Sequence, residues 1–322
     1  PGSLDMASKA LRLADDKAKM SVGKQLITYF CKPCKPTKVN GGRERNLPEH
    51  APEKWALFKE YCVRDVVAER EIRHRLSGFP VRSEEQRLWE LDQRINDRGV
   101  GTDAQLVFEA IAFDADFKRR IVAHAAALTG LPNPASGEQL KRWIEQQEGF
   151  FPTSITKDNL PELMTQVQKP EVKEMLRLKQ LMSKTSVKKY EAMQRARCGD
   201  GRVHGLLQFY GANRTGRWAG RLVQVQNLPR NSMTELDDAR ELLRSGNTYA
   251  IEMIYAHPLD VLSQLIRTAF VPRDGYRFIV ADFSAIEARV IAWLAKEKWR
   301  MDVFAKGGDI YCASASKMFG VP

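Results

Sequence analysis

Long apolar runs are absent from the sequence, and cysteine is scarce. No apolar stretch approaches the ~20 residues that a membrane-spanning helix needs, and no signal peptide is visible, so no membrane partner is expected. The five cysteines are scattered and odd in number, which argues against a disulfide framework and favours a reducing cytoplasm. Pro1, Gly2 and Ser3 resemble a cloning scar and say nothing about the fold.

Acidic residues are outnumbered by basic ones. The 322 residues contain 40 Asp and Glu against 51 Lys and Arg, a net charge of +11. Such a surplus favours polyanionic partners, because each phosphate neutralised by a cation releases a condensed counterion. The length allows two or three domains at ~100–200 residues each. With 43% hydrophobic residues, the chain can bury a sizeable core and is not of a disordered type.

Helical patterns dominate the chain. A long basic pattern over 171–197 predicts a single helix, which is either a solvated surface or a helix that follows a phosphate backbone. Residues 31–52 are rich in Pro and Gly and predict a loop. Within that loop Cys31 and Cys34, with His50 nearby, invite a zinc interpretation, but a closed structural site needs four ligands and no second pair is suitably spaced. The other predicted helical regions are 4–30, 53–76, 83–124, 139–148 and 234–266. Within 83–124, residues 96–99 predict a turn, and a second helix is expected from about Asp103.

One segment has no acidic residue at all. Residues 201–230 contain five arginines and neither Asp nor Glu. Arginine bonds phosphate through two donors at once, and Gln and Asn can read acceptors present at every base pair in the minor groove. The alternative is an ordinary polar loop. The candidate nucleic-acid ligands in and after the run from Tyr210 to Arg221, which includes Asn213, are Arg214, Thr215, Arg217, Arg221, Gln224, Gln226 and Asn227.

A second segment joins an apolar run to a carboxylate. Phe278-Ile279-Val280 predicts a buried strand that delivers Asp282 to a sheet edge, where a hard cation could use its oxygens. A helix is expected from Ser284 onward. Ser284 and Glu287 have the spacing of a capping box, which would explain both residues without any chemistry.

Four motifs resemble those of family A DNA polymerases of the phage or prophage type, and they follow one another along the chain in the family's order. Thr215-Gly216-Arg217 with Gln226-Asn227-Leu228-Pro229 is similar to the family's TGR…NLQN-I/L-P pattern, although Gln224 stands where Asn is usual and residues 231–265 look like an insertion. Asp282-Phe283-Ser284-x-Ile286-Glu287 resembles motif A. Ile266-Arg267-Thr268-Ala269-Phe270 and the stretch from Asp309 to Pro322 resemble its neighbours.

The resemblance implies a mixed α/β, predominantly helical fold in four parts. Residues 1–82 would be the end of a 3′→5′ exonuclease-like domain, since Tyr61 and Asp65 look like its third motif. Residues 83–154 would be a helical lead-in to the polymerase region, 155–200 the thumb, and 201–322 the first half of a palm with a small antiparallel sheet.

The resemblance also implies roles for single residues. Asp282 and the Phe283 carbonyl would hold Mg²⁺ in an incomplete two-metal site, and Glu287 would be a catalytic-site residue that disfavours a ribose 2′-hydroxyl. Primer–template DNA and deoxynucleoside triphosphates would be the partners, in the cytoplasm of a bacterial or phage-infected cell. The residues near the incoming nucleotide would be Phe283, Ser284, Ile286, Glu287 and Tyr311, where Tyr311 replaces a usual His.

Motifs B and C, which supply the fingers helix and the second catalytic aspartate, are not found in the sequence. The chain is therefore expected not to polymerise alone. It could be an engineered piece, a proteolytic product, or one half of a split polymerase whose partner polypeptide supplies the missing motifs. The alternative function is a non-catalytic module that binds primer–template DNA.

Overall fold

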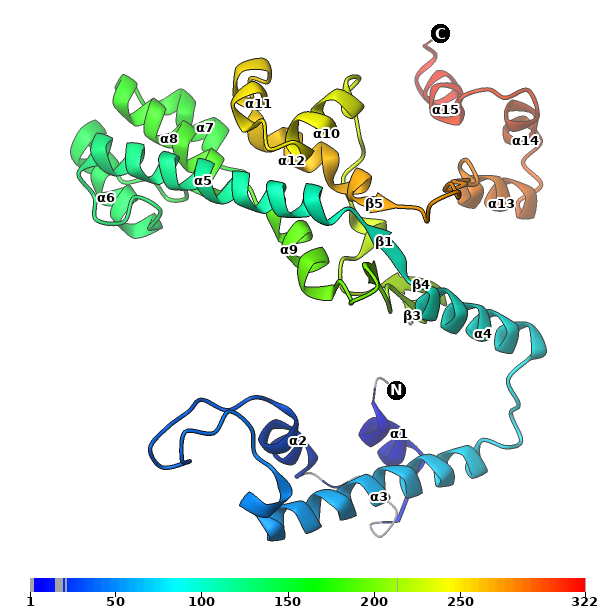
Figure 1. The fold of residues 1–322 in the computed structure, drawn as a ribbon. Helices are drawn as coiled ribbons and strands as arrows, with labels where there is room; N and C mark the ends of the chain where they lie inside the picture. Colours follow the sequence, from blue (N-terminus) through cyan, green and yellow to red (C-terminus); the bar gives the residue numbers. More distant parts are fainter. Residues whose placement is uncertain (1–2, 15–19, 21, 213, 322) are drawn as a thin grey trace. The chain divides into compact units, whose positions relative to one another are not determined.

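A computed structural model describes residues 3–14, 20, 22–212 and 214–321. The chain divides into two compact units, 1–93 and 94–322 (Figure 1). No helix among these residues is long and apolar enough to span a membrane.

The first unit is built on one long helix. Helices α1 (Leu4–Ala10) and α2 (Gly23–Cys31) pack against α3 (Pro52–Arg75), and η1 (Pro48–His50) precedes α3. The helix predicted over 53–76 is thus confirmed. The helical region predicted over 4–30 is confirmed in part: α1 and α2 lie at its two ends, but α1 stops at Ala10 and Arg12 adopts a left-handed φ of 52°.

A glycine allows α2 to pack closely against α3. A Cβ at Gly23 would overlap the ring of Tyr61, so only glycine allows this approach. The ring of Tyr61 is 6% exposed and stacks on Phe58, which in turn stacks on Phe30. These aromatic contacts form the core of the first unit.

The second unit is arranged along α5 (Ala104–Thr129), which follows α4 (Ser83–Arg98) and the short strand β1 (Val100–Thr102). Asp103 caps α5 by accepting a hydrogen bond from the Leu106 amide, so the helix start predicted near Asp103 is confirmed. Helices α8 (Pro170–Met182) and α9 (Val187–Ala196) pack on α5. The remaining helices on this part of the chain are α6 (Gly137–Glu148), α7 (Leu160–Gln166), α10 (Leu236–Arg244), α11 (Thr248–Ile254) and α12 (Pro258–Leu265).

The single helix predicted over 171–197 is two helices. The chain leaves α8 at Met182 and enters α9 at Val187, with Ser-Lys-Thr-Ser between them. Ser and Thr side chains compete with helical backbone hydrogen bonds, which makes them weak helix formers. Lys184 in this break also bonds Asp260, at 2.5 Å between Nζ and Oδ1. The contact ties the α8–α9 connection to α12.

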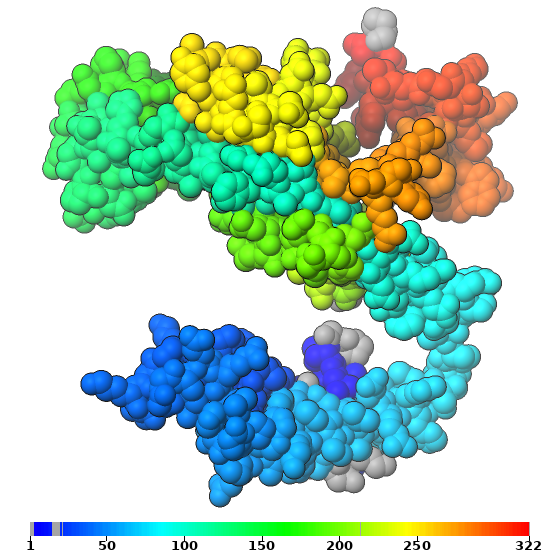
Figure 2. Space-filling view, viewed as in Figure 1, coloured from blue at the N-terminus to red at the C-terminus, as the bar shows by residue number. Residues whose placement is uncertain are grey.

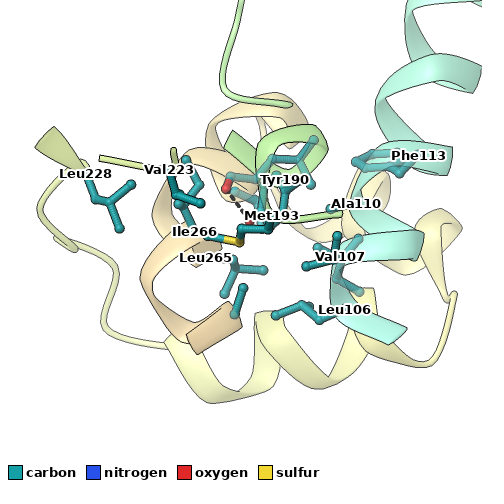
Figure 3. Close-up of a cluster of buried hydrophobic side chains, with 14 of the residues drawn as sticks. Leu106, Val107, Ala110, Phe113, Tyr190, Met193, Val223, Leu228, Leu265 and Ile266 are labelled. Atoms are coloured by element: carbon teal, nitrogen blue, oxygen red, sulfur yellow. Dashed lines mark hydrogen bonds between the residues drawn. The ribbon is translucent and has the colours of Figure 1, made fainter. Parts of the chain in front are cut away.

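Two hydrophobic clusters lie along α5. One surrounds Ile121 and Ala125 together with α6, α7 and α8. The other joins α5 to α9, to the α10–α12 layer and to residues 223–228 (Figure 3). On the surface, the teal residues of α5 adjoin the yellow α10–α12 layer (Figure 2). Its centre includes Tyr190, which is fully buried and donates a hydrogen bond to the Leu262 carbonyl at 2.7 Å. This second cluster is the base of the candidate site.

The small antiparallel sheets are present, as predicted. β1 is the centre of a three-stranded sheet with β2 (Arg202–Val203) and β5 (Phe270–Val271) at its edges. β3 (Leu207–Ala212) and β4 (Arg217–Gly220) form a separate hairpin with an irregular register between Gln208 and Ala212. The other short elements are η2 (Val225–Asn227) and η3 (Ile266–Ala269).

The buried strand predicted at Phe278-Ile279-Val280 is not formed. These residues are extended but unpaired among the described residues, and their exposed fractions are 50%, 85% and 91%. A strand is stabilised by hydrogen bonds and side-chain contacts from a neighbouring strand, and apolar residues alone do not provide them. The chain then continues into α13 (Ile286–Leu294), α14 (Lys298–Ala305) and α15 (Ile310–Phe319).

Candidate nucleic-acid interface

The β3–β4 hairpin presents the first group of predicted ligands. Arg214, Thr215 and Arg217 are all exposed at or beside its turn, while Asn213 lies outside the described residues. Gly216 has a φ of 69°, and a Cβ there would lie 2.8 Å from the ring of Tyr210. The turn is therefore a conformation that glycine permits, and it projects its cationic and hydroxyl side chains into solvent.

The base of the hairpin is fixed from α4. The Asn96 side-chain amide donates to the Leu207 carbonyl at 2.9 Å, and its oxygen accepts from the Leu207 amide at 3.0 Å. His204 lies just before the hairpin, with its ring nitrogens near the Asp97 carbonyl and the Asp200 carboxylate. The hydrogen bond to Asp200 raises the pKa of His204 above its ordinary value.

The segment after the hairpin alternates buried anchors with exposed polar side chains. Val223 and Leu228 are 0% and 7% exposed and belong to the cluster under α5 and α9 (Figure 3). The predicted ligands between and beside them face solvent. These exposed residues are Arg221, Gln224, Gln226 and Asn227.

Gln226 lies directly over a glycine of β4. A Cβ at Gly220 would overlap the Gln226 side chain, so the glycine is what lets the amide lie against the strand. Gln224 adopts a left-handed φ of 56° immediately before η2, and its side-chain oxygen accepts a 3.5 Å hydrogen bond from Asn227. The polar side chains of the segment thus lie close to the hairpin and to one another.

Two cations from other elements hold this segment by its backbone. Lys189 of α9 donates from Nζ to the Val223 carbonyl at 2.7 Å. Arg267 of η3 donates from Nε to the Pro229 carbonyl at 2.6 Å and from Nη2 to the Leu228 carbonyl at 2.8 Å. Sequence reasoning missed these contacts; the one signal was that Arg267 stands in a motif of the resembled family.

Replacing Arg267 by alanine should loosen residues 224–228. Removal of two charge-assisted hydrogen bonds should lower the free energy of local opening by about 1–2 kcal/mol, which corresponds to amide exchange roughly 5–30 times faster. Hydrogen exchange followed by mass spectrometry measures this. Arg273→Ala removes the same charge from an exposed position and serves as the control. Equal amide exchange rates in the two variants would show that Arg267 does not hold residues 224–228 in place.

The predicted metal-binding segment lies in exposed, extended chain. Asp282 and Phe283 are exposed, and the Phe283 ring is 78% accessible. No group of three or more His, Cys, Asp or Glu side chains that could hold a metal ion occurs in the part of the chain that the structure describes. Within that part, the segment offers the Asp282 carboxylate without such a group around it.

The capping box predicted from Ser284 and Glu287 is wrong. Helix α13 begins at Ile286, its N-cap is Ala285 with a left-handed φ of 51°, and no side chain caps it. The Ser284 carbonyl instead accepts a 2.8 Å hydrogen bond from Arg289 Nε. Glu287 forms an ion pair with Arg217 of β4. The structure thus brings together two side chains that come from different sequence motifs.

Tyr311 is not brought to this contact. It is 80% exposed near the start of α15, where the Asp309 carboxylate accepts hydrogen bonds from the Tyr311 and Cys312 amides. Asp309 is thus the N-cap of α15, and the Tyr311 side chain projects into solvent.

The candidate exonuclease residues lie in the first unit. Tyr61 and Asp65 are one turn apart on α3; Tyr61 is buried and Asp65 is half-buried. Nearby, the Cys34 thiol contacts the Arg43 carbonyl at 3.3 Å within the loop that follows α2, while Cys31 is exposed.

Comparison with known proteins places this fold among polymerase domains. A structure of the POL domain of Pol1 from M. smegmatis, in complex with DNA primer-template and dNTP, aligns with 98% of the chain and 50% of its own, with a TM-score of 0.50 and 18% identity. The sequence profile described as DNA polymerase family A matches residues 118–322. The chain belongs to DNA polymerase family A, as the motifs predicted.

Relatives of known sequence include phage and bacterial polymerases. The DNA polymerase of Bacillus phage SP02 is 58% identical over all 322 residues, which are 49% of that protein. The thermostable DNA polymerase I of Thermus aquaticus is 44% identical over 61 residues, 19% of this chain and 7% of that enzyme. The chain thus spans about half the length of the phage relative.

Proposed function

We propose that the protein serves template-directed DNA synthesis. This chain would supply the surface that binds primer–template DNA and the first metal-binding carboxylate. The observation that carries the proposal is the ion pair between Arg217 and Glu287. It joins the exposed, acid-free segment around the β3–β4 hairpin to the segment that contains Asp282. A surface for phosphate and a carboxylate for a metal are the two requirements of phosphoryl transfer to a DNA end.

The arginines of the hairpin would bind primer–template phosphates. Arg214, Arg217 and Arg221 are exposed. Each guanidinium group can donate two parallel hydrogen bonds to the oxygens of one phosphate. Gln226 and Asn227 would contact minor-groove acceptors, together with Thr215 and Gln224 nearby. Because these acceptors occur at every base pair, such contacts suit a protein that binds any sequence.

The nucleotide-binding site would lie at the start of α13 and in the residues just before it. The carboxylate of Asp282 and the carbonyl of Phe283 would be ligands of Mg²⁺, a cation that prefers oxygen. Glu287 would limit the space at the sugar 2′ position of a deoxynucleoside triphosphate. Phe283, Ser284 and Ile286 would line that site with Glu287, and Tyr311 of α15 would be a neighbour of the phosphates.

The described residues do not complete a two-metal site. Such a site holds two ions ~3.5–4 Å apart, which needs more than one carboxylate. Within the described ranges no cluster of carboxylates surrounds Asp282, and Glu287 is engaged by Arg217. The residues present therefore fit one side of the metal site.

The chain would consist of four parts of a polymerase. Residues 1–82 would derive from a proofreading exonuclease domain, with Tyr61 and Asp65 as remnants of its site. Residues 83–154 would lead into the polymerase region, 155–200 would be the thumb, and 201–322 the first half of the palm. The whole would act in the cytoplasm of a bacterial or phage-infected cell.

Primer extension tests the function. The chain alone should incorporate no deoxynucleotide, because its described residues leave the metal site incomplete. A chimera in which this chain replaces the matching 49% of the phage SP02 polymerase should extend a primer. A second polypeptide that carries the missing motifs should do the same. Robust synthesis by the chain alone would contradict the proposed division of the site.

A non-catalytic DNA-binding module is the alternative. This alternative predicts that the chain binds primer–template DNA in the same way, but that the chimera does not extend a primer. A folded chimera that binds DNA and does not extend the primer would favour this alternative.

A further inference from the structure

The loop between α2 and η1 carries an unusual density of positive charge. Residues 31–47 contain three lysines, two arginines and one glutamate, a net charge of +4 in 17 residues, whereas the whole chain carries +11 in 322. The side chains of Lys32, Lys35, Lys38 and Arg45 are exposed. None of these four side chains has a hydrogen bond or ion pair with another described residue, unlike helix cations such as Arg142 and Arg177.

The loop is held by its own side chains. Asn40 is central: its amide nitrogen donates to the Lys35 carbonyl at 2.8 Å, and its oxygen accepts from the amides of Thr37 and Gly42 at 2.8 and 3.1 Å. The Cys34 amide closes the base of the loop by donating to the Glu44 carbonyl at 2.8 Å. The loop is therefore a folded structure that fixes the spacing of its cations.

The loop is also fastened to its helices. The Arg43 guanidinium donates from Nε to Asn46 Oδ1 at 3.0 Å, and Asn46 in turn donates from Nδ2 to the Tyr29 carbonyl of α2 at 3.0 Å. Arg43 is thus used internally, which leaves the four exposed cations for a partner. Figure 1 shows the loop extending away from α2 and α3 of its own unit.

We infer that this loop is a second DNA-binding surface, which contacts the phosphodiester backbone through Lys35, Lys38 and Arg45. Because its own hydrogen bonds hold the backbone of the loop, binding of a polyanion orders only the cationic side chains and not the loop itself. A Cβ added at Gly41 or Gly42, at the tip, would meet no other described residue within 4 Å, so a sugar–phosphate strand can approach the backbone closely there. DNA is the partner because the chain belongs to a DNA polymerase family; in that respect the inference rests on the proposed function.

A charge-removal series in the full chain tests the loop. The loop variant combines Lys35→Ala, Lys38→Ala and Arg45→Ala. The matched control combines Lys59→Ala, Arg70→Ala and Arg73→Ala, three exposed cations on α3 of the same unit. Fluorescence anisotropy with labelled single-stranded and duplex DNA, from low to high salt, measures affinity and its salt dependence.

The loop variant should bind at least about tenfold more weakly at about 0.1 M salt. If all three contacts are lost, the slope of log affinity against log salt concentration should become shallower by about 2 on single-stranded DNA. On duplex DNA the slope should become shallower by about 2.7. The substrate with the larger change identifies the form of DNA that the loop binds. Asn40→Ala, which keeps every cation but removes the central hydrogen bonds, should weaken binding to a smaller extent.

Equal affinity and slope for the loop variant and the α3 control, on both substrates, would overturn the inference. A third variant, Arg214→Ala with Arg217→Ala and Arg221→Ala, separates this outcome from failure of the proposed function. If only the hairpin variant lost DNA binding, the hairpin would be a DNA-binding surface and the loop would not. If only the loop variant lost DNA binding, the loop would bind DNA and the proposed role of the hairpin would be wrong.

Discussion

Replacing Asp282 by alanine should reduce DNA synthesis by the chimera with the phage SP02 polymerase by about 10³-fold or more. Loss of a ligand that helps a metal stabilise transition-state charge removes several kcal/mol, and each ~1.36 kcal/mol is tenfold in rate. Primer extension under single-turnover conditions gives the rate. Affinity for primer–template DNA should stay within about twofold, because Asp282 contributes no positive charge to the grip.

The control for this experiment is Asp302→Ala. Asp302 is an exposed aspartate on α14, so its removal changes the net charge equally without touching the proposed site. Synthesis by this variant should match that of the parent chimera. If Asp282→Ala retained a tenth or more of the parent rate, the metal-binding role assigned to Asp282 would be wrong.

Replacing Tyr190 by alanine should lower the free energy of unfolding by about 3–5 kcal/mol, the usual cost of truncating a buried aromatic side chain. Tyr190 is fully buried at the junction of α9, α5 and α12. Tyr190→Phe keeps the ring but leaves the Leu262 carbonyl without its 2.7 Å hydrogen bond, and should cost about 1–3 kcal/mol. Urea unfolding followed by circular dichroism measures both variants.

Tyr249→Ala is the matched control for the core variants. Tyr249 is 74% exposed on α11, and surface substitutions of this kind usually change stability by less than about 0.5 kcal/mol. A Tyr190→Ala variant no less stable than Tyr249→Ala would show that the cluster does not depend on the buried ring. Val223 and Leu228 anchor residues 223–228 in this cluster, so its loss should also disturb the candidate interface.

Local sequence rules predicted the parts of the fold that depend on nearby residues. The start of α5 follows from Asp103, whose carboxylate caps the helix by accepting from an amide three residues further on. Helix α3 was also predictable from nearby residues, because its apolar residues recur at helical spacing. The order of the motifs then predicted the family, although no single motif identified it.

The errors arose where distant contacts decide the structure. Apolar residues at 278–280 have the composition of a strand, but pairing requires a neighbour that composition does not provide. Ser284 and Glu287 have capping-box spacing, yet Glu287 pairs with Arg217, which is 70 residues away in the sequence. A local pattern cannot reveal such competition between partners.

The clamp formed by Lys189 and Arg267 also bears on how this surface can vary during evolution. Both cations bond main-chain carbonyls, of Val223, Leu228 and Pro229, so these bonds do not depend on the side chains of the segment between them. The course of the backbone is therefore largely independent of the side chains it displays. Substitutions at exposed positions such as Arg221 can therefore accumulate without moving their neighbours. The two cations thus leave a polymerase lineage free to change the proposed DNA-binding side chains one residue at a time.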